Sequence, residues 1–149
     1  MTSKSMGAIL GAAAAVIAVA AVPAQARNEV TMINIDQVLK SDDAKSQLDP
    51  EVRFYFGSKR HPAATADFGE TSVKAKAGGD TDYLACGKAF VEAMGDLQKT
   101  AKKAGANAVV DVRSFFKRKE NFSATQVECH SGSFSSVVEL KGRLISTGK

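Results

Sequence analysis

The strongest periodic pattern in the chain is helical and lies between residues 80 and 105. Apolar side chains recur there at steps of three and four residues, which places them on one face of a helix. These side chains are Cys86, Phe90, Ala93, Met94, Leu97, Ala101 and Ala104. Asp80 or Thr81 can cap its start, and Gly105 can supply the left-handed residue that commonly follows a helix end. The pattern therefore predicts a long helix from Asp80 or Thr81 to about Ala104.

Alternation of apolar and polar residues predicts strands on both sides of this helix. The predicted strands cover residues 29–35, 52–56 and 68–77 before the helix, and 106–117, 124–130 and 137–145 after it. Residues 36–48 predict a short helix, and residues 117–121 a charged connection. Because the last three strands follow the helix with short turns between them, the sequence predicts an α+β fold. In this fold one long helix packs on the apolar face of an antiparallel sheet.

Phe115 and Phe116 raise the question of what covers the second face of the sheet. Strict alternation buries one of the two rings and turns the other to the opposite face, together with Val109 and Val137. We expect the N-terminal segment 29–48 to cover that face. The alternative is a surface for self-association or for an unknown protein partner.

Residues 1–26 have the composition of a secretory signal peptide. Lys4 is the only charged residue, 7–22 is an uninterrupted run of small apolar residues, and Pro23 precedes the cleavage motif A-Q-A. We expect cleavage after Ala26, a periplasmic or secreted product, and a single α+β domain over 27–149. A spanning helix needs roughly 20 apolar residues, so we expect no stable membrane anchor.

The chain has two cysteines, Cys86 on the apolar face of the predicted helix and Cys129 on the apolar face of a predicted strand. These two faces should pack together, and an even cysteine pair in an exported protein favours a disulfide. The alternative is a metal site or a reactive thiol, for which the two residues lack the C-x-x-C spacing.

Charge and motifs point away from nucleic acids and from catalysis. The chain has 20 Lys and Arg against 16 Asp and Glu, and its basic residues form short clumps typical of a solvated surface rather than of a nucleic-acid interface. These clumps are Lys59-Arg60, Lys102-Lys103 and Lys117-Arg118-Lys119. No phosphate loop is present, because Ala89 follows Gly87-Lys88 and position 82 is Asp.

The two histidines offer little chemistry by themselves. His61 lies in a polar loop, and alternation sends His130 to the opposite face from Cys129, which disfavours a metal site formed by that pair. Glu128 and His130 share a face, so a weak surface metal contact stays open as an alternative. We expect no enzyme activity, no catalytic or metal site, and no cofactor.

Residues 97–112, L-Q-K-T-A-K-K-A-G-A-N-A-V-V-D-V, resemble the helix-to-strand junction of the YbjQ-like family. The same junction, followed by a Cys-bearing strand, is similar to the RcsF-like envelope-stress sensors, and the resemblance covers about 83–145. It implies an α+β fold and no enzyme activity. YbjQ-like proteins are described as heavy-metal binders that form ring oligomers, but no ligand set carries over to this chain. The RcsF-like lipid anchor does not transfer either, because no Cys lies near the cleavage motif.

The whole chain also resembles small exported bacterial proteins that are often labelled an excinuclease ATPase subunit. The export signal and the missing phosphate loop argue against that label. We therefore predict an exported, periplasmic, non-catalytic binding or envelope-sensing module of unknown ligand. The alternative is a heavy-metal-binding protein.

Overall fold

The computed structural model describes residues 26–148, so the predicted signal peptide lies outside the described residues except for Ala26. The described part folds into seven strands and three helices. In chain order they are β1 (Glu29–Asn34), α1 (Ile35–Leu39), α2 (Asp42–Gln47), β2 (Arg53–Phe56), β3 (Ala64–Ala77), α3 (Asp82–Ala104), β4 (Ala108–Phe116), β5 (Lys119–Asn121), β6 (Gln126–Ser131) and β7 (Ser136–Thr147). No helix among residues 26–148 has the length and apolar character needed to cross a membrane.

All seven strands belong to one sheet, in which β7 is the central strand. β3 pairs antiparallel along the whole of one edge of β7. The other edge is shared, because β6 pairs with β7 only at His130↔Val137 and Ser131↔Ser136, and β4 takes over from Ser114↔Leu140 onward. β1 then pairs with β6, β5 pairs with β4, and β2 pairs with β4 in the parallel direction. The sheet therefore forks where β4 and β6 separate.

The predicted fold class is wrong. The sheet is mixed rather than antiparallel because of the β2–β4 pair, and strands make up 44% of the described residues against 28% for helices. Two short helices, α1 and α2, accompany α3. The physical reason is that alternation identifies a strand but specifies neither its neighbour nor its direction, so the three early strands could not be placed in the sheet.

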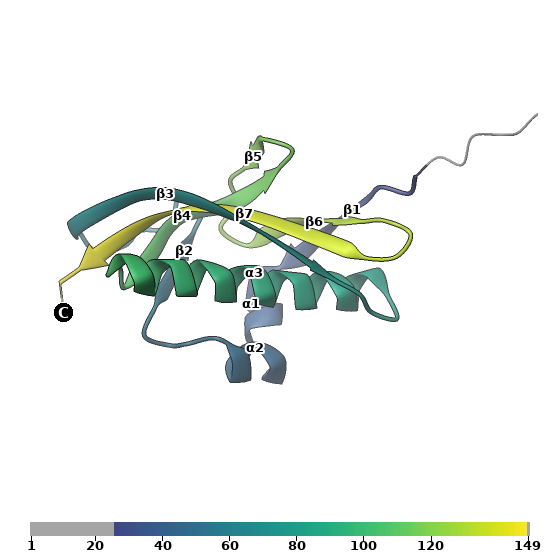
Figure 1. Cartoon of the computed structure of the whole chain (residues 1–149), viewed down its shortest axis with the longest axis horizontal. Coiled ribbons are helices and arrows are strands. Elements are labelled where there is room, and N and C mark those ends of the chain that lie inside the picture. Colours follow the sequence, from purple (N-terminus) through teal and green to yellow (C-terminus); the bar gives the residue numbers. More distant parts are fainter. Residues whose placement is uncertain (1–25, 149) are drawn as a thin grey trace, which may run out of the picture.

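Helix α3 lies across one face of the sheet, which we call the inner face; the opposite side is the outer face (Figure 1). The Thr81 hydroxyl caps the helix by accepting a hydrogen bond from the Leu84 amide at 3.2 Å, and Gly105 ends it with a φ of 82°. Its apolar stripe, including Phe90 and Leu97, is fully buried against the inner face of the sheet. The inner face thus holds the main hydrophobic core.

The expectation that residues 29–48 cover the outer face is also wrong. β1 extends the sheet beside β6, and α1 and α2 lie on the same side as α3 (Figure 1). Ile35, Val38 and Ala44 therefore join the inner core. Among the described residues, no helix packs on the outer face.

Strand β4 departs from the strict alternation predicted for it. Its pairing with β7 shifts register between Val110 and Arg113, where Asp111 has a φ of 52°. Val109 and Val112 consequently both belong to the inner core instead of lying on opposite faces. This bulge changes the face to which the side chains in the second half of β4 point, so Arg113 lies on the outer face.

Candidate functional site

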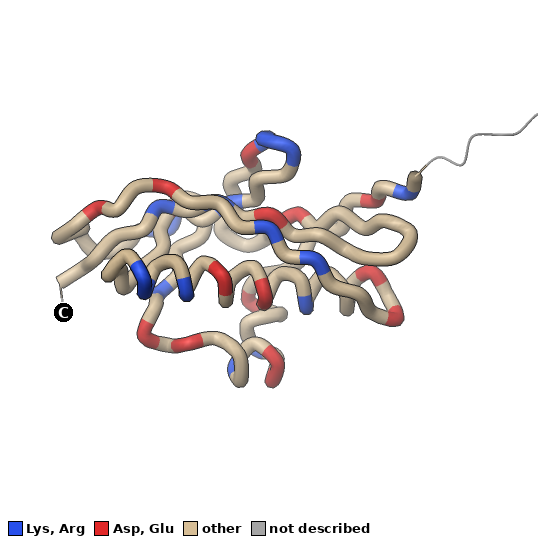
Figure 2. Tube along the Cα trace, viewed as in Figure 1, with Lys and Arg blue, Asp and Glu red and all other residues tan. Residues whose placement is uncertain are grey.

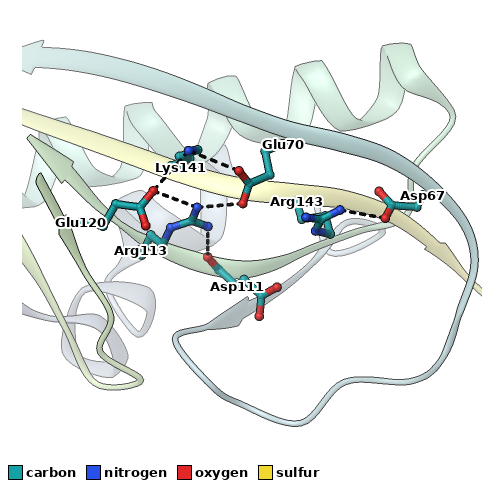
Figure 3. Close-up of polar contacts among 7 residues, drawn as sticks. All are labelled: Asp67, Glu70, Asp111, Arg113, Glu120, Lys141 and Arg143. Carbon is teal, nitrogen blue, oxygen red and sulfur yellow. Dashed lines mark hydrogen bonds and ion pairs between the residues drawn. The ribbon is translucent and has the colours of Figure 1, made fainter. Parts of the chain in front are cut away.

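The outer face carries a network of four charged side chains centred on Arg113, whose side chain is only 4% exposed. Its guanidinium donates to Glu70 on β3 at 2.7 Å and to Glu120 on β5 at 3.1 Å. A third hydrogen bond reaches the Asp111 carbonyl at 3.0 Å. Lys141 on β7 lies 3.2 Å from each of the two carboxylates. Two cations and two anions from four strands thus form a closed cluster (Figure 3).

The electrostatics of this cluster favour permanent charge. Hydrogen bonds from Arg113, and then from Lys141, hold the pKa of both Glu70 and Glu120 below the usual value of 4.5. Both carboxylates are therefore ionised at neutral pH and can accept hydrogen bonds but have no proton to donate. The cluster neutralises itself, so it ties strands together rather than presenting a reactive acid or base.

A second ion pair extends the charged area along β3 and β7. Arg143 donates to Asp67 at 2.9 Å (Figure 3). The Gly69 amide, and then Arg143, hold the pKa of Asp67 below its usual 3.8. Both side chains are about half exposed, at 41% and 48%. Exposed pairs of this kind contribute little stability, so Arg113 is the energetic centre of the charged area.

His130 lies on the outer face at the fork between β4 and β6. Its ring stacks on Phe116, with ring centroids 3.4 Å apart and planes 10° from parallel. Both ring nitrogens are buried and have no hydrogen-bond partner among the described residues, while Nε2 lies 3.5 Å from a carboxylate oxygen of Glu128. Asn121 donates to the other oxygen of that carboxylate at 2.7 Å. His130 is therefore positioned by stacking, with both ring nitrogens shielded from solvent.

Exposed apolar residues adjoin His130 on strand β1. Val30 pairs across the strands with His130 and Met32 with Glu128, which places all four on one face. Val30 is 56% exposed and Met32 39% exposed. Because β1 pairs only with β6, its other edge has no strand partner in the described part of the chain. The fork region thus exposes apolar side chains of β1 beside the stacked rings of His130 and Phe116.

The predicted disulfide is confirmed. Cys86 on α3 and Cys129 on β6 are joined at an S–S distance of 2.01 Å, and both are fully buried on the inner face. Cys129 and His130 point to opposite faces, which agrees with the alternation argument. His61 lies in the loop before β3, where its ring packs edge-on to Tyr55.

A separate groove runs between the α1–α2 segment and α3. Its volume is about 250 Å³, and apolar side chains form much of its lining, among them Val38, Tyr83, Leu84 and Val91. Tyr83 and Leu84 are 40% and 52% exposed. No charged pair or titratable cluster converges on it, so the outer face remains the better candidate site.

The sequence did not reveal the Arg113 network, although part of its signal was present. The alternation over 137–145 places Glu139, Lys141 and Arg143 on one polar face. It could not show that Glu70 would lie beside Lys141, because that contact depends on how β3 pairs with β7. Glu120 lies in what we expected to be a connection and is instead the short strand β5.

The chain matches no family model, no curated protein and no solved structure. The resemblance to the YbjQ-like and RcsF-like families therefore depends on the residues of 83–145 alone, and function has to be argued from the geometry of the site.

Proposed function

We propose that this protein is an exported, non-catalytic binding module that contacts a protein partner through the fork region of its outer face. One observation carries the proposal. Strand β1 exposes Val30 and Met32 beside His130, whose ring is covered by Phe116 of β4 and whose nitrogens have no hydrogen-bond partner among the described residues. Exposed apolar side chains bordered by polar residues are typical of interaction surfaces.

Two further features support a location outside the cytoplasm and a non-catalytic role. The leader over 1–26 has the composition of a signal peptide, and the disulfide between Cys86 and Cys129 suits an oxidising compartment. The charged groups of the Arg113 network are paired with one another, which suits a structural role better than acid–base chemistry. The resemblance to envelope-sensing proteins is consistent with a binding role outside the cytoplasm.

The location is tested by fractionating cells that produce the full chain with a C-terminal tag. We expect the tagged protein in the periplasm or medium, beginning at Arg27 and without free thiols. A cytosolic product that keeps Met1 and has two reduced cysteines would refute export.

The surface is tested by placing a photo-crosslinking residue at Met32 and, as a matched control, at exposed Gln47 on α2. We expect a discrete adduct from position 32 in living cells and none from position 47. Adducts of equal yield at both positions, or none at position 32, would reject the fork as the contact surface.

Heavy-metal binding is a second candidate, favoured by the geometry of His130. Two ligands about 2.1 Å from a tetrahedral zinc ion lie roughly 3.4 Å apart, and the His130 nitrogen lies 3.5 Å from Glu128. The described residues contain no group of three or more His, Cys, Asp and Glu side chains that could hold a metal ion, so water or a partner would complete the coordination. Calorimetry with zinc and copper should give a heat that His130→Ala removes; no heat for the unaltered protein would end this candidate.

A further inference from the structure

The hairpin between β4 and β5 ends in a turn of two cationic residues. The strands pair as far as Phe116↔Lys119, and the two residues between them, Lys117 and Arg118, have φ angles of 49° and 65°. A two-residue turn with both φ values positive is the type I′ turn, for which Asn-Gly is strongly preferred. Residues with a Cβ are disfavoured in this conformation. Local backbone preference therefore does not explain why Lys and Arg stand here.

The charges of this tip, residues 117–119, are unpaired. Lys117, Arg118 and Lys119 are exposed, and none of them lies within ion-pair distance of a carboxylate among residues 26–148. The hairpin projects from the outer face, and its end is basic (Figures 1 and 2). The Lys117 ammonium lies 5.5 Å from the centre of the Phe116 ring. Arg113 is paired with Glu70 and Glu120. The charges of the tip have no such partners, so the tip is the part of the hairpin that is free to bind an anion.

We propose that the tip, residues 117–119, docks reversibly on an anionic phospholipid surface. No hydrogen bond among the described residues fixes these three side chains, so they form no preorganised cup for a single small phosphate. A plane of many anionic headgroups needs no such cup and attracts each nearby Lys or Arg. A protein interface would need buried anchor side chains at its centre, and the tip supplies none. Three cations give weak, reversible binding rather than stable anchoring.

This inference rests on the proposed function, in which the protein is exported. An exported module meets the outer leaflet of the inner membrane or the lipid of the envelope. The lipid contact adds to that function the chemistry of a second partner. A further exposed basic pair, Lys59 and Arg60, follows Gly57, whose backbone approaches Ser123 just beyond β5. That pair can add to the attraction once the tip has docked.

The test compares Lys117→Asn/Arg118→Gly with the mature protein in co-sedimentation with phosphatidylglycerol–phosphatidylcholine vesicles. The Asn-Gly turn keeps the hairpin in its preferred conformation while removing two charges. We expect affinity for these vesicles to fall roughly 30-fold, from about 1 kcal/mol for each cation near an anionic surface. The matched control, Lys45→Gln/Lys103→Gln, removes two exposed charges from α2 and α3, on the side of the sheet opposite the tip (Figure 1), and should lose less than about twofold by the same reasoning.

Four outcomes would overturn the proposal. Equal losses in both variants would mean that overall charge, not the tip, drives binding. Displacement from the vesicles by millimolar inorganic phosphate at constant ionic strength would indicate a small-anion site. Binding to polyglutamate beads but not to vesicles would indicate an acidic protein partner. Vesicle binding by a protein found in the cytosol would refute export alone, whereas an exported protein that ignores vesicles would refute the lipid contact alone.

Discussion

The two faces of the sheet share the same strands but differ in how their side chains are satisfied. On β7, Val138 and Leu140 are fully buried under α3, whereas Glu139 and Lys141 between and beside them lie on the outer face. The inner face excludes water with apolar side chains and is cross-linked by a disulfide. The outer face pairs the charges of the Arg113 network laterally, stacks His130 on Phe116, and leaves the charges of the hairpin tip unpaired. The comparison suggests that stability is concentrated on the inner face, so the outer face can carry binding groups.

Removal of the disulfide should have the largest effect, and it acts on the inner face. The bond spans a sequence separation of 43, for which the chain-entropy model gives about 4 kcal/mol of the free energy of unfolding. Cys86→Ala/Cys129→Ala should therefore unfold at a much lower urea concentration. When the unaltered protein is measured with a reductant, its urea midpoint should shift toward that of the double variant. An unchanged midpoint would show that the inner face does not depend on the cross-link.

Neighbouring valines on β7 test the two faces directly. Val138→Ala removes methyl groups from a fully buried position and should cost about 2 to 3 kcal/mol, counting both transfer and cavity. Val137→Ala, on the half-exposed outer side opposite His130, should cost less than about 1 kcal/mol. Equal losses in urea unfolding would mean that the outer face around Val137 is packed as tightly as the inner face.

Loss of Arg113 tests whether the outer face contributes to stability at all. Arg113→Met leaves Glu70 and Glu120 with only Lys141 as a partner. Because these carboxylates are 34% and 33% exposed, we expect a loss of about 2 kcal/mol, less than for a fully buried pair. Glu120→Gln, which leaves the Arg113–Glu70 pair intact, should cost less. A variant as stable as wild type would show that the network only organises the strands.

The same network predicts an acid-dependent loss of stability. Arg113, and then Lys141, lower the pKa of Glu70 and Glu120 in the folded protein. A carboxyl group with a lowered pKa stabilises the fold above its unfolded value, near 4.5 here, and that stabilisation is lost as pH falls through the folded value. Urea midpoints should therefore decline below about pH 4.5, and less steeply in Arg113→Met. Equal slopes in the two proteins would contradict this assignment.

The smallest effect should be a gain, at the tip of the hairpin. Lys117→Asn/Arg118→Gly replaces two residues at positive φ with the pair preferred in a type I′ turn. The free energy of unfolding should rise by about 1 kcal/mol. Thermal unfolding measures this gain independently of lipid binding. A loss of stability would mean that Lys117 or Arg118 makes a contact that holds the hairpin.

Much of the inner face was predictable from the sequence. The stripe that includes Phe90 and Leu97 repeats every three to four residues, and helix α3 with its Thr81 cap and Gly105 end follows from such local chemistry. The disulfide followed from two cysteines on faces that had to pack together. Periodicity is local information, so it identifies a helix or a strand and its buried side without knowledge of its neighbours.

The pairing of charges on the outer face was decided by the tertiary structure. The Arg113 network requires the pairing of β3 with β7 and the bulge at Asp111, and neither leaves a mark in the alternation of residues. Parallel pairing of β2 with β4 and the placement of α1 and α2 beside α3 were equally invisible. Strand order and register depend on contacts between residues far apart in the chain, and many pairings satisfy the same apolar pattern. The assembled sheet therefore decides which charged side chains form ion pairs and which do not.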